Sequence, residues 1–166
     1  NGEYIVAGSS DKKVYVFHKN SSIPLWTYET EELLQYYSVS ISANGEDIVA
    51  GSNDDKVYLF DKDSSSPLWS YDTEANIESV AISSDGKYIS SSSEDNEIIV
   101  FAKTSSNPLW SYTTGGDVTS IAICADGKYI TAGSADDHVY TFRNNQVSHP
   151  SILPYGPRSG TETLLN

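Results

Sequence analysis

The chain has 166 residues, of which 38% are hydrophobic and 11% aromatic, and this composition excludes a disordered chain that cannot bury a core. A formal net charge of −13 repels phosphate and anionic headgroups, so we expect neither nucleic-acid binding nor attraction to a membrane surface. The one cysteine, Cys124, excludes an intramolecular disulfide, and no apolar run is long enough to predict membrane insertion.

The first part of the chain predicts four β-strands in order. Residues 4–9 (YIVAGS) and 13–17 (KVYVF) are rich in β-branched and aromatic residues and flank a polar turn at Asp11. A serine-rich turn then leads to a strand that begins at a Leu-Trp pair ending in Trp26. After an acidic stretch, residues 38–42 (SVSIS) alternate small and branched side chains, which suits a strand crowded around a central axis.

The same order of strands recurs along the rest of the chain. Asn-Gly or Asp-Gly pairs, which favour tight hairpins, separate the units. The units begin near Gly2, Gly45, Gly86 and Gly127, and the phenylalanines Phe17, Phe60, Phe101 and Phe142 keep the same register. Four antiparallel strands in each unit of about 41 residues predict an all-β fold, a β-propeller of about four four-stranded antiparallel blades.

The two ends of the chain differ from the repeats. We expect residues 1–143 to form the blades and residues 144–166, rich in Pro, Gly and polar residues, to form a degenerate last strand and an irregular tail. Both ends fall inside a blade and methionine is absent, so we expect a fragment or a processed product. Three arrangements stay open: part of a ring of about seven or eight blades, a homodimer that completes one ring, or a small ring of about four blades.

Two families resemble these units. Stretches such as DGKYI and AGSNDDKVYLF resemble blades of WD-repeat proteins, whose turn aspartate matches Asp11, Asp54, Asp95 and Asp136. The Trp-Asp pair of that family is replaced, for example by Phe60-Asp61. The segment FDKDSSSPLWSYDT (60–73) resembles quinoprotein-like blades of the pyrroloquinoline quinone type. That resemblance implies that the tryptophans pack between blades; these structural residues are Trp26, Trp69 and Trp110.

No catalytic, cofactor-binding or metal-binding residue is predicted. His18, His138 and His149 lack the spacing of a metal motif, and no nucleophile elbow or phosphate-binding glycine loop is present. The acidic turns at 52–55, 93–96 and 134–137 contain the oxygen ligands that calcium prefers. Because these side chains also cap turns of their own, we expect turn capping rather than calcium binding, and no cofactor.

Nearly all of the net charge falls on one side of the predicted blades. Alternate turns of an antiparallel blade lie on the same side, and the acidic turns all belong to one set. We expect this side to bind a basic protein partner or, alternatively, only to keep the surface soluble. The predicted partner-binding residues are Glu31, Glu32, Tyr36, Tyr37, Asp54, Asp55, Glu74, Asp95, Asp136 and Asp137.

These patterns predict a noncatalytic interaction or scaffold module. Two alternatives stay open. The quinoprotein resemblance implies a fragment of a propeller enzyme with a calcium-held quinone. The glycosylation acceptor Asn20-Ser21-Ser22, with few Lys and Arg residues, favours a structural protein at the cell surface, outside the cytoplasm.

Overall fold

A computed structural model describes residues 2–34, 38–144 and 151–154, and these residues form fifteen strands in four antiparallel sheets. We call the sheets blades 1 to 4 in chain order. Blade 1 contains β1 (Tyr4–Ser9), β2 (Lys13–His18) and β3 (Trp26–Glu29); blade 2 contains β4 (Val39–Ile41), β5 (Asp47–Gly51), β6 (Lys56–Asp61) and β7 (Trp69–Asp72). Blade 3 contains β8 (Ile77–Ile82), β9 (Tyr88–Ser93), β10 (Glu97–Ala102) and β11 (Pro108–Thr113); blade 4 contains β12 (Val118–Ile123), β13 (Tyr129–Ser134), β14 (His138–Arg143) and β15 (Ser151–Pro154).

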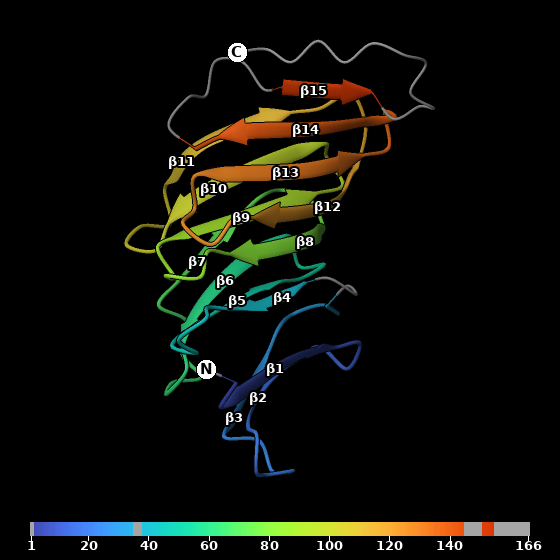
Figure 1. Ribbon diagram of the computed structural model, residues 1–166. Coiled ribbons are helices and arrows are strands. Elements are labelled where there is room, and N and C mark those ends of the chain that lie inside the picture. Colours follow the sequence, from blue (N-terminus) through green and yellow to red (C-terminus); the bar gives the residue numbers. More distant parts are fainter. Residues whose placement is uncertain (1, 35–37, 145–150, 155–166) are drawn as a thin grey trace.

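Each blade is a meander in which strands adjacent in sequence pair in space. The blades stack in chain order from blade 1 (blue) to blade 4 (orange and red) (Figure 1). Strands near the start of consecutive blades contact one another, as β4 contacts β1, β8 contacts β4, and β12 contacts β8. The predicted fold class is therefore confirmed as part of a β-propeller, with three strands rather than four in blade 1. How a ring closes stays a prediction.

The hydrophobic core lies between the blades and not within them. Successive side chains of a strand point to opposite faces, so one strand serves two neighbours. In β6, Tyr58 and Phe60 pack against blade 1, whereas Val57 and Leu59 pack against blade 3. A third cluster of the same kind joins blades 3 and 4. A blade with neighbours on both sides is thus buried on both faces, which explains its runs of consecutive apolar residues.

A tryptophan links each blade to the next. The Trp69 ring in β7 lies 5.4 Å from the ring of Phe101 in blade 3, and its Nε1 donates to the carbonyl oxygen of Lys103 at 2.8 Å. The equivalent contacts are Trp26 with Phe60 (5.4 Å) and the Lys62 carbonyl (2.6 Å), and Trp110 with Phe142 (5.2 Å) and Asn144 Oδ1 (2.9 Å). The indole thus contributes apolar area and one hydrogen bond that also fixes the position of the neighbouring blade.

Cys124 has the same local role as serines at the equivalent turns. Its Sγ donates to Asp126 Oδ1 at 2.9 Å, as Ser83 Oγ donates to Asp85 Oδ1 at 2.7 Å. Cys124 is nevertheless only half-buried, whereas Ser83 is fully buried. Blade 4 covers this side of blade 3, whereas no described residue covers the same side of blade 4.

Candidate protein-binding face

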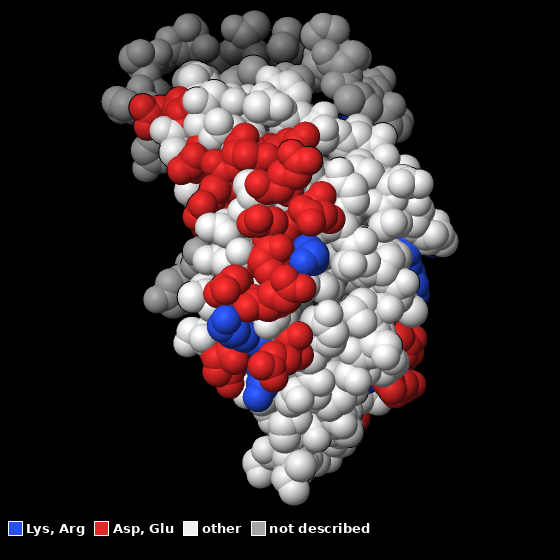
Figure 2. All heavy atoms as spheres, turned by 180° about the vertical axis from the view of Figure 1, so that it is seen from behind, with Lys and Arg blue, Asp and Glu red and all other residues white. Residues whose placement is uncertain are grey.

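Because the strands of a blade alternate in direction, two sets of connections lie on one side of the stack. They are the turns β1–β2, β5–β6, β9–β10 and β13–β14, and the loops after β3, β7 and β11. On this side, acidic side chains form a band that contains a few lysines (Figure 2). We call it the acidic band. A contact between blades 1 and 2 joins two of its parts, since Lys56 Nζ lies 3.7 Å from Glu31, and within blade 3 Asn76 Nδ2 donates to Glu94 at 3.0 Å.

Two aspartates of the band are held by hydrogen bonds within the protein. Asp54 Oδ1 accepts from the Lys56 amide (3.2 Å), and its Oδ2 accepts from the Tyr58 hydroxyl (2.8 Å) and from the Glu31 amide of blade 1 (3.0 Å). Asp136 repeats this arrangement with the His138 amide (3.1 Å), the Tyr140 hydroxyl (2.6 Å) and the Gly115 amide of blade 3 (2.8 Å). Each carboxylate therefore shapes its own turn and joins two blades.

The bond between Asp136 and Tyr140 shifts the pKa of both partners. The hydrogen bond from the Tyr140 hydroxyl is the main reason why the pKa of Asp136 falls to about 2. Burial, followed by the hydrogen bond to Asp136, raises the pKa of Tyr140 to about 12. Burial and the bond to Asp54 likewise raise the pKa of Tyr58. Each of these carboxylates keeps its negative charge but has few acceptor positions left for a direct hydrogen bond to a partner.

A different group of acids is crowded rather than satisfied. Burial, followed by the nearby negative charges of Glu94 and Asp117, raises the pKa of Glu78 above its usual range. A basic side chain placed here would relieve this repulsion. Sequence reasoning put these three residues on the acidic side but left them out of the predicted binding set. The repulsion acts within blade 3, between Glu78 and Glu94, and extends to Asp117, which immediately precedes β12 of blade 4.

The structure brings the predicted binding residues onto one side but divides them by exposure. Asp54, Asp55 and Asp136 are half-buried, and the rest of the described set is exposed: Glu31, Glu32, Glu74, Asp95 and Asp137. Asp95 Oδ1 accepts hydrogen bonds from Ser93 Oγ and from the Glu97 amide, so it also caps its turn. Tyr36 and Tyr37 lie outside the described residues.

With this geometry in place, comparison with known families gives one clear match. The model for the WD domain, G-beta repeat (WD40), matches residues 30–61, 65–101 and 106–142, which is more than half of the chain. The chain belongs to the WD40 family. WD40 repeat domains are generally noncatalytic scaffolds and typically bind proteins. No curated protein matches the chain. The likeness to quinoprotein blades stays a prediction.

The WD40 blades of this chain replace the family's Trp-Asp pair. The turn aspartate instead pairs with a tyrosine four residues later, as Asp54 does with Tyr58. The same pair occurs as Asp11 with Tyr15 (2.5 Å) and Asp136 with Tyr140 (2.6 Å). In blade 3, Ile99 stands at the tyrosine position and Asp95 bonds to Ser93 instead. A local hydrogen bond thus holds the turn without the Trp-Asp pair.

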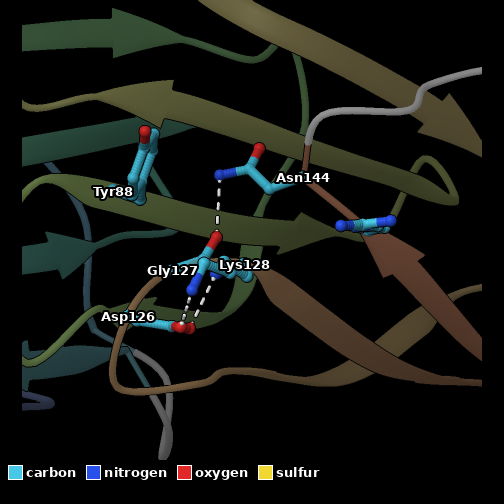
Figure 3. A pocket seen from close by; sticks show the side chains of 6 residues that line it. Tyr88, Asp126, Gly127, Lys128 and Asn144 are labelled. Carbon is cyan, nitrogen blue, oxygen red and sulfur yellow. Dashed lines mark hydrogen bonds and ion pairs between the residues drawn. The ribbon is translucent and has the colours of Figure 1, made fainter.

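A cavity of about 240 Å³ lies between WD40 blades 3 and 4, at the Asp126-Gly127 turn (Figure 3). Tyr88 from blade 3 and Gly127 and Asn144 from blade 4 are among the residues that line it. Arg143 lines it too, and two of its other polar groups are engaged within blade 4, since Lys128 Nζ lies 2.7 Å from Asp126 and Asn144 Nδ2 donates to the Gly127 carbonyl at 2.9 Å. Between blades 2 and 3, Asp47 and Lys103 occupy the positions of Tyr88 and Asn144, and they form an ion pair (2.6 Å). The cavity is thus a variation in blade packing.

Among the residues that the structure describes, no group of three His, Cys, Asp or Glu side chains could hold a metal ion. The described segments also include no helix that is long and apolar enough to cross a membrane.

Proposed function

We propose that this WD40 chain is a noncatalytic interaction scaffold whose acidic band binds a basic segment of a partner protein. Membership of the WD40 family supports protein binding as the general role. The gathering of acidic side chains along one side of four blades carries the finer proposal (Figure 2). Such a field would attract and orient a cationic partner before contact.

The exposed carboxylates supply the direct contacts in this proposal. Glu31 and Glu32 are well placed because their side chains are 81% and 57% exposed and their ion pairs with lysines are long, at 3.7 and 3.4 Å. Exposed pairs of this kind contribute little to stability, so an incoming arginine or lysine could replace them at small cost. The crowded carboxylates around Glu78 add a second attachment point one blade further along.

The test compares two double variants that each remove two lysine-paired carboxylates. Glu31→Gln with Glu32→Gln changes the acidic band, and Glu46→Gln with Asp63→Asn changes the opposite side, where both acids pair with Lys62. Binding of a capped, lysine- and arginine-rich peptide is measured by fluorescence anisotropy at low and high salt. We expect the band variant to weaken binding by roughly threefold to tenfold and the opposite-side variant to leave it unchanged.

Two results would contradict the proposal. One is the absence of peptide binding even at low salt, and the other is equal weakening by both variants, which would show that only net charge matters. Both variants should keep their free energy of unfolding within about 0.5 kcal/mol of the parent chain, because they change exposed charges. A loss of binding would therefore reflect the surface and not the fold.

A further inference from the structure

The cavity between blades 3 and 4 lies where a lysine side chain stands at the other two boundaries between blades. Between blades 1 and 2, Lys62 Nζ lies 5.5 Å from the centre of the Tyr4 ring. Between blades 2 and 3, Lys103 has the same position in the repeat and lies 2.6 Å from Asp47. The equivalent residue between blades 3 and 4 is Asn144. The cation that this repeat position supplies at two boundaries is therefore replaced by a shorter, neutral side chain at the third.

The residues around this position have opposite charges at the first and the last boundary. In blade 2, Lys62 lies 3.6 Å from Glu46, and Asp61 precedes it at the end of β6. The matching residues of blade 4 are Lys128 and Arg143, because Glu46 and Lys128 accept the same backbone hydrogen bond and Asp61 and Arg143 end the same strand. Two acids that flank a lysine in blade 2 thus correspond to two cations beside the cavity in blade 4. Surroundings that suit a cation at the first boundary suit an anion at the last.

Arg143 supplies a positive charge that no described residue balances. On the side opposite the acidic band, the three lysines of blades 3 and 4 have acidic partners: Lys87 with Asp85 (2.9 Å), Lys103 with Asp47 (2.6 Å) and Lys128 with Asp126 (2.7 Å). Arg143 is exposed, and no described residue forms an ion pair or a side-chain hydrogen bond with it. Although the whole chain has a net charge of −13, the described residues around the cavity therefore carry an excess of positive charge.

The other groups that line the cavity leave donors for an anion. Asp126 is the one acid among the lining residues, and it accepts hydrogen bonds from the Lys128 amide (3.2 Å) and from Cys124 Sγ (2.9 Å) in its own turn. The ion pair of Lys128 with Asp126 is exposed, and exposed pairs contribute little to stability, so Lys128 can turn to another anion at small cost. The Tyr88 hydroxyl has no hydrogen-bond partner among the described residues.

We propose that this cavity (Figure 3) binds one anionic side chain of a partner protein, a carboxylate or a phosphate, between Arg143 and Lys128 and beside Tyr88. A guanidinium can donate two parallel hydrogen bonds to either group, and the ammonium and the phenol hydroxyl can each donate one. The volume of about 240 Å³ is below the roughly 300–1,000 Å³ of pockets for drug-sized ligands, so it suits a single side chain. This site goes beyond the proposed function, because it lies opposite the acidic band and takes a ligand of opposite charge.

The test uses the full chain, labelled with nitrogen-15, and three capped tripeptides: Gly-Glu-Gly, Gly-phosphoserine-Gly and Gly-Gln-Gly. We expect at least one of the two anionic peptides to shift the amides of residues 126–128 and 143–144, and the one that binds more tightly identifies the anion. Arg143→Gln and Lys128→Gln should each weaken this binding by about fivefold or more. Lys87→Gln is the matched control, because Lys87 and Lys128 are 72% and 67% exposed and each pairs with the aspartate two residues before it. It should change binding by less than about twofold.

Three results would overturn the inference. The first is no shift with either anionic peptide at millimolar concentration, and the second is an equal shift with the glutamine peptide, which would mean that the contact ignores charge. The third is equal weakening by Lys87→Gln and Lys128→Gln, which would mean that only net charge matters. All three protein variants change exposed charges and should keep the urea midpoint of the parent chain, so a loss of binding would reflect the cavity and not the fold.

Discussion

Two regions of the repeat differ in how strongly the residue type is kept from blade to blade. One is the set of boundaries between blades, and the other is the acidic band. At the three boundaries the residue type recurs, as with Trp26, Trp69 and Trp110, and each copy packs on a phenylalanine of the following blade. In the band, exposed acids differ from blade to blade: Ala75 stands at the position equivalent to Glu32, and Asn53 at the position equivalent to Glu94. Recurrence therefore marks what the packing of blades needs, and variation occurs at exposed positions that this packing leaves free.

The largest effect that separates the two regions is expected at a boundary. Trp69→Ala removes the packing on Phe101 and the hydrogen bond to the Lys103 carbonyl, so we expect it to lower the free energy of unfolding by about 3 kcal/mol. Urea denaturation followed by circular dichroism measures this change. Leu68→Ala is the control. The Leu68 side chain is next to Trp69 in sequence and is 52% exposed, so this variant should lower the free energy of unfolding by no more than about 0.5 kcal/mol. Equal losses would mean that the tryptophan does not join the blades.

Two serines of blade 3 should change the free energy of unfolding by a smaller amount and in opposite directions when each is replaced by alanine. Ser91 is fully buried, its hydroxyl has no partner among the described residues, and it lies where blades 2 and 4 have Ala50 and Ala132. Ser91→Ala should therefore raise the free energy of unfolding by about 1 kcal/mol, because an unsatisfied hydroxyl is removed. Ser83→Ala should lower it by about 1 kcal/mol, because Ser83 Oγ bonds to Asp85 and to the Tyr88 amide.

Thermal and urea unfolding of both serine variants under one condition decides this prediction. The chemical change is the same in the two proteins, so intrinsic strand preference and lost volume largely cancel. A destabilising Ser91→Ala would show that the hydroxyl has a partner, such as a bound water.

The smallest effect concerns pH and the acidic band. Because the pKa of Asp136 lies at about 2 in the folded chain, below its ordinary 3.8, its ionised form stabilises the fold above that ordinary value. This contribution should be lost as pH falls from about 4 through 2. Tyr140→Phe removes the main cause of the lowered pKa, so the stability of this variant should fall less steeply over that range.

Chemical denaturation at several pH values between about 2 and 5 measures these slopes. Tyr129→Phe, at an exposed tyrosine, should keep the slope of the parent chain. An unchanged slope in Tyr140→Phe would mean that other carboxylates, such as Asp85, account for the acid sensitivity, since its pKa is also lowered to about 2.

The sequence by itself determined the all-β class, the order of the strands and the division into blades. The physical reason is that pairing inside a blade is local: β5 pairs with β6 and β6 with β7 across short turns, so period-two patterns and turn residues carry the information. The sequence also placed the acidic turns on one side, because direction alternates from strand to strand.

Only the tertiary structure decided which of these residues are available. It engaged Asp54 and Asp136 in bonds between blades, crowded Glu78 with Glu94, and left Ile5 exposed while burying Ile48 in the same repeat position. The hydrogen bonds of Asp54 and Asp136 and the exposure of Ile5 depend on a neighbouring blade, or on its absence from the described residues, whereas Glu78 and Glu94 meet within blade 3. A repeat pattern is the same in every copy, whereas burial, hydrogen bonding and repulsion depend on what lies beside each copy.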